Sequence, residues 1–436
     1  MDSAATTTRA GALALDAADA LAPLRNEFVL PDGLIYLDGN SLGALPRRTP
    51  RRIAEVVESE WGQGLIRSWN SAGWIELSRR IGDRIAALIG AGPGEVSVGD
   101  STSINLYKAL SVAVAMQRLD APARRVVLTE RGNFPTDVYI AESIAAAASL
   151  RLERAGADAL ADRLGNDVAV LMLTHVNYRS GRIHDMAGLT QAAHAAGALV
   201  VWDLAHSAGA LPVELLAADA DFAVGCGYKY LNGGPGAPAF VWAHPRHSER
   251  MDREQLRQPL SGWLGHARPF EFAPSYRPAE GIGRFVCGTP PVLAMAALEC
   301  GVEVFDAAAA CGGMAAIRAK SIALTTLFID HVETLCAGHG LTLASPRDAA
   351  SRGSQASFAH VEGYALMQAL IERGVIGDFR AGDPADPANA EDLLRFGFTP
   401  LYTRFVDAWD AAAQLHGLLE DGSWRDERFQ RRIAVT

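Results

Sequence analysis

The chain has 436 residues, of which 49% are hydrophobic and 21% are charged, enough for a large core and a second, smaller domain. Its formal net charge of −10 argues against a nucleic-acid-binding protein, because such proteins carry a basic footprint. There is no membrane-length apolar run and no signal-like N-terminus, and the five cysteines show no C-x-x-C or zinc spacing. We therefore expect a cytoplasmic protein with free thiols.

Short apolar, β-branched runs alternate with helical patterns through the middle of the chain. The strand-like runs lie at 125–129, 168–173, 198–202 and 221–224, and helical patterns lie at 186–196 and 211–217. This alternation is typical of buried parallel strands joined by crossover helices. It predicts an α/β domain with a mostly parallel central sheet flanked by helices, in which ligands bind at the carboxyl ends of the strands.

A second mixed pattern fills roughly the last hundred residues, with a strand-like run at 355–360 and a helical run at 363–373. We expect these residues to form a smaller α+β domain together with the start of the chain. The predicted division is residues 1–50 as an N-terminal segment that joins the small domain, 51–305 as the large domain, and 306–436 as the small C-terminal domain.

Two segments of the large domain carry weak signals for a ligand. Asp100-Ser101-Thr102-Ser103 precedes a helical pattern at 106–116, and hydroxyl and N–H groups at a helix N-terminus bind phosphate well. Ordinary capping of the helix by Ser or Thr explains this segment equally well. Phe134, in Asn133-Phe134-Pro135-Thr136-Asp137, could stack on an aromatic ligand, although a Phe-Pro turn often simply packs on the core.

Asp203 and Lys229 give a stronger signal as a pair. Asp203 directly follows one apolar run, and Lys229 follows the next one, 26 residues later. Alone, each has an ordinary explanation, as a turn-capping Asp or a surface lysine. Together they fit one βα unit, which brings both to the same edge of the sheet. A carboxylate against a pyridinium nitrogen and an imine-forming lysine are what pyridoxal 5'-phosphate (PLP) requires, so the pair predicts a PLP enzyme.

Arg395 stands in an apolar, aromatic run of the predicted small domain, Leu394-Arg395-Phe396-Gly397-Phe398. A buried charge is costly unless it is paired, so this residue needs an anion. A substrate carboxylate held by two hydrogen bonds would serve. The alternative is a structural ion pair with an Asp or Glu of the small domain, and Arg404 is a weaker candidate for the carboxylate-binding role.

These segments resemble the kynureninase family of PLP enzymes, within the fold-type I, aminotransferase class V group, over most of the chain. The most specific matches are Asp203-Leu204-Ala205-His206, Tyr228-Lys229-Tyr230-Leu231-Asn232 and Gly262-Trp263-Leu264-Gly265-His266, and further matches lie at 36–43, 134–137, 287–291 and 352–355. The fold implied by this resemblance is the fold-type I PLP-dependent transferase fold.

The resemblance also implies roles for individual residues. Lys229 would form the Schiff base with PLP, and Asp203 would pair with the ring nitrogen, with His206 nearby. Phe134 would stack on the ring. Asp137 would lie close to the cofactor, and Thr174 would touch the region of the ring oxygen. Thr102 (or Ser101), Ser103 and Tyr228 would contact the phosphate, joined by Trp263 and Thr289 across a homodimer with shared active sites. Thr289 stands where some relatives have Asn. Arg395 would bind the substrate carboxylate, with Asn40 and Ser41 in the substrate pocket.

The implied reaction is the hydrolysis of L-kynurenine, or of 3-hydroxykynurenine, to anthranilate or 3-hydroxyanthranilate and L-alanine in tryptophan degradation, with Lys229, Tyr228 and Asp203 as catalytic residues and no metal. The alternative is a cysteine desulfurase or selenocysteine lyase of the same fold. Its nucleophilic loop cysteine has no counterpart in Arg352-Gly353-Ser354-Gln355. A catalytically silent PLP-fold regulator would carry a basic DNA-binding segment and lack Lys229, and neither condition holds.

Overall fold

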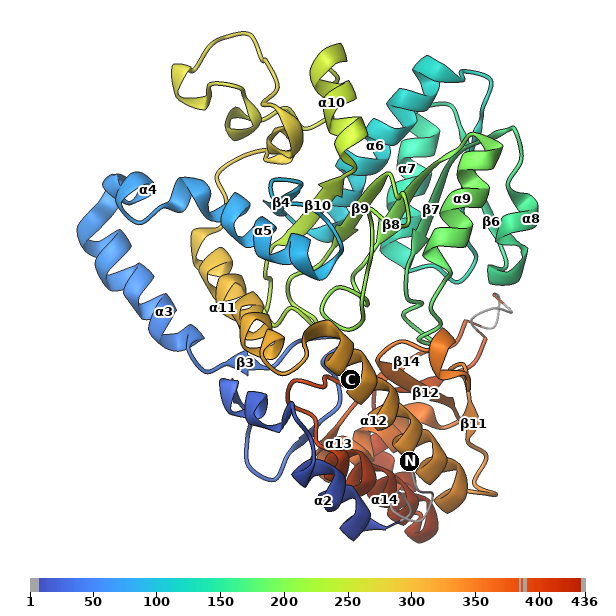
Figure 1. The fold of residues 1–436 in the computed structure, drawn as a ribbon. Coiled ribbons are helices and arrows are strands. Elements are labelled where there is room, and N and C mark those ends of the chain that lie inside the picture. The colour runs from blue at the N-terminus through green and yellow to red at the C-terminus, as the bar shows by residue number, and fades with distance from the viewer. Residues whose placement is uncertain (1–7, 384–385, 387–389, 433–436) are drawn as a thin grey trace.

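The computed structural model describes residues 8–383, 386 and 390–432. A large sheet with helices on both faces forms one part of the molecule, and a smaller sheet with its own helices forms the other (Figure 1). In spatial order the strands of the large sheet are β4 (Val96–Gly99), β10 (Ala239–Ala243), β9 (Phe222–Gly225), β8 (Leu199–Asp203), β7 (Val168–Thr174), β5 (Val126–Glu130) and β6 (Arg151–Ala155). Only β10 runs antiparallel to its neighbours. The predicted mostly parallel α/β sheet is confirmed.

The strands of the large sheet are apolar throughout because both faces are covered. In β8, Val200 and Trp202 point to one core, whereas Val201 points to the other. The helices of this part are α5 (Leu77–Leu88), α6 (Thr102–Asp120), α7 (Pro135–Ala147), α8 (Leu160–Arg163), α9 (Met186–Ala196), α10 (Pro245–Glu254) and α11 (Val292–Ala309). Helices α5 and α9 contribute to the first core, and α6 and α7 to the second. Two buried faces explain the uninterrupted hydrophobic runs of the sequence.

The predicted helix at 211–217 is wrong, because this stretch forms turns without a helix. Its backbone is already used elsewhere: the N–H groups of Leu215 and Leu216 donate to the carbonyl oxygens of Ile89 and Gly90, at 3.1 and 3.2 Å. Strands β8 and β9 are parallel neighbours as expected, but the connection between them is made of turns rather than a crossover helix.

The smaller sheet is antiparallel, in the order β11 (Thr342–Leu343), β12 (Gln355–Ala359), β15 (Leu393–Gly397) and β14 (Asp378–Arg380). Around it lie α12 (Gly313–Leu335), α13 (Gly363–Glu372), α14 (Phe405–Asp421) and α15 (Glu427–Gln430). The predicted strand at 355–360 and helix at 363–373 are confirmed within one residue. The fold as a whole is the expected α/β architecture with a smaller α+β part.

The N-terminal segment touches both parts of the molecule. Helix α2 (Arg9–Ala17) packs on α14 (Figure 1), and β2 (Ile35–Tyr36) pairs with β13 (Val375–Ile376). In contrast, Leu24, which lies in a short 3-10 helix at Ala22–Glu27, and Phe28, the first residue of β1 (Phe28–Val29), belong to the core of the large sheet. We propose to keep residue 305 as the end of the large domain, with residues 1–50 as an N-terminal segment that joins the small domain.

An elongated helical arm follows the N-terminal segment and projects from the body of the molecule (Figure 1). After β3 (Leu45–Pro46), α3 (Thr49–Glu55) continues into π-helical turns at Val56–Gly64, and α4 (Ser68–Ser71) ends the arm. The arm exposes Trp61, Leu65 and Ile66, which are 58%, 57% and 77% accessible. None of the helices in the described part of the chain has the length and apolar character needed to cross a bilayer.

Candidate active site

The register of the large sheet brings the predicted cofactor-binding residues at the strand ends to one edge of the sheet. Thr174 pairs with Asp203 at the carboxyl ends of β7 and β8, and Asp203 pairs with Val224 of β9. On the other side of β10, Gly99 ends β4 just before the start of α6. The segments that follow these strand ends therefore converge on one edge, as expected for a ligand site in such a sheet.

Lys229 lies at the centre of this edge. Its Nζ lies 3.0 Å from His206 Nε2 and 5.8 and 5.7 Å from the ring centroids of Phe134 and Tyr228. Burial, followed by the charge of Lys229, lowers the pKa of His206 well below its usual value. His206 is therefore neutral and offers its Nε2 lone pair to Lys229.

The chain contains three lysines, and the other two are engaged elsewhere. Lys108 Nζ pairs with Asp100 at 2.6 Å and donates to the Phe285 carbonyl oxygen. Lys320 Nζ pairs with Asp19 at 2.7 Å and donates to the Pro400 carbonyl oxygen. Lys229 is the lysine that remains without a carboxylate partner in the described structure, which makes it the candidate for an imine.

Asp203 and Asp137 form a coupled pair of buried carboxyl groups. Burial and the negative charge of Asp203 raise the pKa of Asp137 well above its usual value. Burial also raises the pKa of Asp203, while Lys229 opposes this effect. Asp203 Oδ1 accepts from the Ala205 N–H at 2.8 Å. Two carboxyl groups so close cannot both ionise easily, so one proton resides on the pair, mainly on Asp137.

At the N-terminus of α6, the hydroxyl groups of Ser101 and Thr102 have different surroundings. The sequence had left open which of the two would bind a phosphate. Ser101 is the N-cap, and its Oγ accepts from the Ile104 N–H at 3.4 Å. Thr102 Oγ1 is buried and has no hydrogen-bond partner in the described structure. Ser103 lies in the first turn of the helix. The capping explanation therefore accounts for Ser101 but leaves Thr102 available for a ligand.

Unpartnered polar atoms gather among the residues expected to hold the cofactor. Within the described structure, buried atoms without a hydrogen bond include Thr102 Oγ1, Asp137 Oδ2, Thr174 Oγ1 and His206 Nδ1. Buried polar groups in proteins are nearly always paired, and each exception needs an explanation. Phe134 is 37% exposed, so its ring is open to a stacking partner. A phosphorylated pyridine with ring oxygen and nitrogen atoms fits this set of groups.

Arg395, on β15, is buried within a polar cluster. Its Nη1 donates to the Tyr178 carbonyl oxygen at 2.7 Å, and its Nη2 donates to Ser41 Oγ at 2.8 Å and to Asp378 Oδ2. In the orientation that satisfies its amide, Asn40 accepts from Arg395 Nε at 3.1 Å. The structure thus brings Arg395, Asn40 and Ser41 together, and it also contains the ion pair with a small-domain Asp that the sequence left as an alternative.

Two residues without a role in the sequence interpretation link Arg395 to the Lys229 cluster. The Tyr178 ring meets the Phe134 ring edge-on at 5.2 Å between centroids, while its carbonyl oxygen binds Arg395. The side chain of Gln355 lies 3.4 Å from that of Asn40 and is close enough to His206 to affect its pKa. Gln355 stood in a matched motif, but no pattern around Tyr178 marks it, because its position comes from the fold of the loop after β7.

Arg404 lies apart from this cluster. It precedes α14, where its side chain forms a two-pronged pair with Asp407, the shortest contact being 2.6 Å. No contact joins it to Lys229 or Arg395 among the described residues. We therefore keep Arg395, and not Arg404, as the candidate for carboxylate binding.

Trp263 and Thr289 are brought together in a different place. They line a hollow of about 750 Å³ with Ile66, Trp69, Asn70, Phe270 and Phe272. The Trp263 ring lies 6.2 Å from that of Trp69 and 5.8 Å from that of Phe270. None of the residues around Lys229 lines this hollow in the described structure. Its apolar walls include Phe270 and Phe272, which are 60% and 75% exposed.

Comparison with known proteins decides the family. A family model for the kynureninase C-terminal domain matches residues 317–415. The kynureninase of Burkholderia pseudomallei (strain 1106a) is 55% identical over 433 residues, which cover 98% of this chain and 100% of that protein. The kynureninase of Pseudomonas fluorescens is 54% identical, over 99% of this chain and 100% of that protein.

The chain belongs to the kynureninase family. Solved structures show the fold at lower identity. A cysteine desulfurase from Thermococcus onnurineus superposes with a TM-score of 0.75 at 19% identity, covering 92% of this chain and 98% of that one. A C-DES mutant with glycine linked to its PLP cofactor gives 0.74 at 18% identity, covering 90% and 98%. This kynureninase-family chain therefore has the fold-type I architecture that the sequence predicted.

Proposed function

We propose that the protein hydrolyses L-kynurenine with water to anthranilate and L-alanine, using PLP bound to Lys229. Membership of the kynureninase family supports the reaction. The observation that carries the site is the cluster of Lys229, His206, Asp203 and Asp137, with its unpartnered buried atoms at one edge of the sheet. The preference between kynurenine and 3-hydroxykynurenine depends on one hydroxyl group, and the proposal covers both.

PLP supplies an electron sink for the substrate carbanion when it is bound. Asp203 would hold a proton at the ring nitrogen, and Asp137 supports the charge of Asp203 by keeping a proton. Phe134 would stack on the ring, Thr174 would approach the ring oxygen, and Thr102, Ser103 and Tyr228 would bind the phosphate. The free N–H groups at the start of α6 add to this phosphate site.

Proton transfers fall to two residues in this proposal. Lys229 Nζ would remove the substrate Cα proton, with neutral His206 as its hydrogen-bond acceptor at 3.0 Å. Burial raises the pKa of Tyr228, so its hydroxyl stays protonated and can donate to an oxygen that gains negative charge near the γ-carbonyl. Arg395, Asn40 and Ser41 would orient the substrate through its α-carboxylate.

We also propose that the working unit is a homodimer with shared sites. The hollow around Trp263 and Thr289 contains no residue of the Lys229 cluster, yet Trp263 would contribute an indole N–H to a phosphate. A contiguous set of exposed apolar side chains on the arm and beside Trp263, formed by Ile66, Phe270 and Phe272, is typical of an interface. A two-fold partner would bury these side chains and place Trp263 at its neighbour's site.

The test of the activity is direct. The purified, PLP-loaded protein is incubated with L-kynurenine, and anthranilate is followed by its fluorescence, while release of sulfide from L-cysteine is measured in parallel. We expect anthranilate from the wild type, none above background from Lys229→Ala, and little sulfide. Sulfide release comparable to anthranilate release would favour a desulfurase. The absence of anthranilate from a correctly folded, PLP-loaded wild type would refute the proposed function.

A further inference from the structure

Arg395 has too few free hydrogen-bond donors to hold a carboxylate alone. A guanidinium group has five N–H donors. Four of those on Arg395 are used, by Asn40, Tyr178, Ser41 and Asp378. One N–H on Nη1 remains, whereas a two-pronged grip on a carboxylate needs two. A second donor must come from another residue.

Arg380 shares the carboxylate of Asp378 with Arg395. On β14, Asp378 lies opposite Arg395, and Arg380 follows two residues later on the same face of the strand. Arg380 Nη2 donates to Asp378 Oδ2 at 2.6 Å. Its Nε is buried and has no acceptor within the described structure. A buried donor of this kind is costly unless a ligand satisfies it.

The local balance of charge also calls for an anion. Asp378 Oδ2 accepts from both guanidinium groups and from Ser41 Oγ. Asp38 is a second carboxyl group near them, but burial and the charge of Asp378 raise its pKa to about 7. Below that pH, one charged carboxylate therefore serves two positive charges. Both arginines lie close enough to the catalytic cluster for their charges to lower the pKa of His206, after the larger effects of burial and of Lys229. One further negative charge would neutralise the pair, and a substrate carboxylate has that charge.

We propose that Arg380 is a second arginine of the substrate site, which binds the substrate α-carboxylate together with Arg395. This inference rests on the proposed function, because it assigns Arg380 a contact with the amino-acid substrate. Asp378 holds both guanidinium groups in place before the substrate arrives. The incoming carboxylate then accepts one hydrogen bond from Arg380 Nε and one from Arg395 Nη1.

The experiment compares two ligands that differ only in the α-carboxylate. For the PLP-loaded wild type, Arg380→Gln, Arg380→Lys and Arg395→Lys, we would measure the KM and kcat of L-kynurenine and the inhibition constant of kynuramine, its decarboxylated counterpart. Kynuramine binding is also followed by the visible absorbance of the cofactor. Arg373→Gln is the control, because Arg373 pairs with Asp421 and Ser423 at the surface of the small domain.

Arg380→Gln should raise the KM of L-kynurenine about 10- to 100-fold, the range of a lost charge-assisted hydrogen bond. The inhibition constant of kynuramine should stay within about threefold. Arg380→Lys keeps the charge and the pair with Asp378 but lacks Nε, so it should raise KM with unchanged melting temperature and cofactor absorbance. Arg373→Gln should change neither constant.

Two results would overturn the proposal: an unchanged KM in Arg380→Gln, or equal losses for L-kynurenine and kynuramine in both Arg380 variants, which would indicate a purely structural residue. Loss of turnover in the wild type is a different failure, because it would refute the proposed function itself and the role of Arg380 with it.

Discussion

Asp38 is a titratable group beside the proposed carboxylate site whose charge changes near neutral pH. It connects to Arg395 through Asn40, whose amide nitrogen lies 3.3 Å from Asp38 Oδ1. Burial and the charge of Asp378 raise the pKa of Asp38 to about 7, although Arg395 acts in the opposite direction. Below this pH Asp38 is neutral, and above it Asp38 competes with a substrate carboxylate for the same arginines.

The KM of L-kynurenine should therefore rise as the pH increases through about 7. A change of about three- to tenfold corresponds to a coupling of up to one pKa unit between Asp38 and the substrate. Asp38→Asn removes the ionisation and should flatten this part of the KM profile. Steady-state kinetics between about pH 6 and 8.5, in or near the range where folded domains are most stable, provide the measurement. The same rise in Asp38→Asn would assign the pH dependence to another group.

At the residue scale, the sequence predicted Asp203 and Lys229 because each directly follows an apolar strand. It did not predict Asp378 or Arg380, although Gly377-Asp378-Phe379-Arg380 alternates charged and apolar residues as a strand does. Their importance depends on the cross-strand pairing of β14 with β15, which local patterns do not contain. The scarcity of lysine is visible in the sequence, but the engagement of Lys108 and Lys320 is visible only in the structure.

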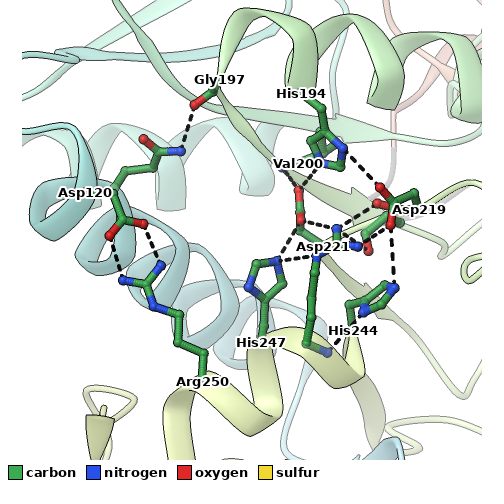
Figure 2. A network of polar contacts seen from close by, with 12 residues as sticks. Asp120, His194, Gly197, Val200, Asp219, Asp221, His244, His247 and Arg250 are labelled. Carbon is green, nitrogen blue, oxygen red and sulfur yellow. Dashed lines mark hydrogen bonds and ion pairs between the residues drawn. The ribbon is translucent and has the colours of Figure 1, made fainter. Parts of the chain in front are cut away.

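At the scale of elements, the buried carboxylate of Asp221 links strands β8 and β9 at their amino ends. The candidate active site lies at the carboxyl ends of the same strands. Asp221, just before β9, accepts from the Val200 N–H of β8 at 2.7 Å and from His194 of α9 at 2.9 Å, and from His247 and Arg246 of α10 at 2.7 and 2.6 Å (Figure 2). Asp219 and His244 border this network. Three elements, β8, α9 and α10, are thus tied to one side chain that stands just before β9 and is 1% exposed.

Asp221→Asn should destabilise the protein by about 3–5 kcal/mol, the range for breaking a buried ion pair. The matched control is Asp219→Asn, whose carboxylate is 60% exposed and should contribute about 1 kcal/mol or less. Urea unfolding at one fixed protein concentration measures both. Equal effects of the two substitutions would contradict the central position assigned to Asp221.

The same network predicts that the free energy of unfolding decreases as the pH falls into the acid range. Its histidine and arginine partners lower the pKa of Asp221 despite burial, which acts in the raising direction. The contribution of Asp221 is therefore complete above its ordinary pKa of 3.8 and is lost as the pH falls towards the folded value. The wild type should lose stability in acid more steeply than Asp221→Asn.

Element by element, sequence patterns located the strands of the large sheet and α9, because their apolar runs are long and continuous. The stretch at 211–217 has a helix-like composition, yet it forms turns, because its N–H groups bind the loop after α5. Tertiary hydrogen bonds of this kind are absent from any local window of sequence. The error did not move the site, since β8 and β9 remain parallel neighbours.

At the scale of the whole molecule, proteins that share this fold can catalyse different reactions. The cysteine desulfurase and C-DES neighbours share the architecture at 18–19% identity, which shows the fold alone. In this chain, the segment at 352–355 has no cysteine. Arg352 in that segment is buried, and its guanidinium group donates to the hydroxyl groups of Thr325 and Thr326 and to the carbonyl oxygens of Pro346 and Arg347. Cys226, near Lys229, has its pKa raised by burial, so it is a poor nucleophile.

The proposed homodimer predicts complementation between two inactive variants. Lys229→Ala and Trp263→Ala are mixed under conditions that exchange subunits. One site of each mixed dimer then combines an intact Lys229 with an intact partner Trp263. Random exchange makes about half of the dimers mixed, so about a quarter of all sites, and of the wild-type activity, should return. No recovery after verified exchange would place Trp263 in the same subunit's site as Lys229.

Borohydride trapping of the cofactor tests the central claim of a PLP site at Lys229 most directly. The PLP-loaded protein is reduced, digested and analysed by mass spectrometry for pyridoxyl-modified peptides. Because the chain has only three lysines, the result is unambiguous. We predict one modification, on the peptide that contains Lys229, and none in Lys229→Ala. Modification of Lys108 or Lys320 instead, or an unmodified Lys229 in protein that retains the cofactor, would contradict the account.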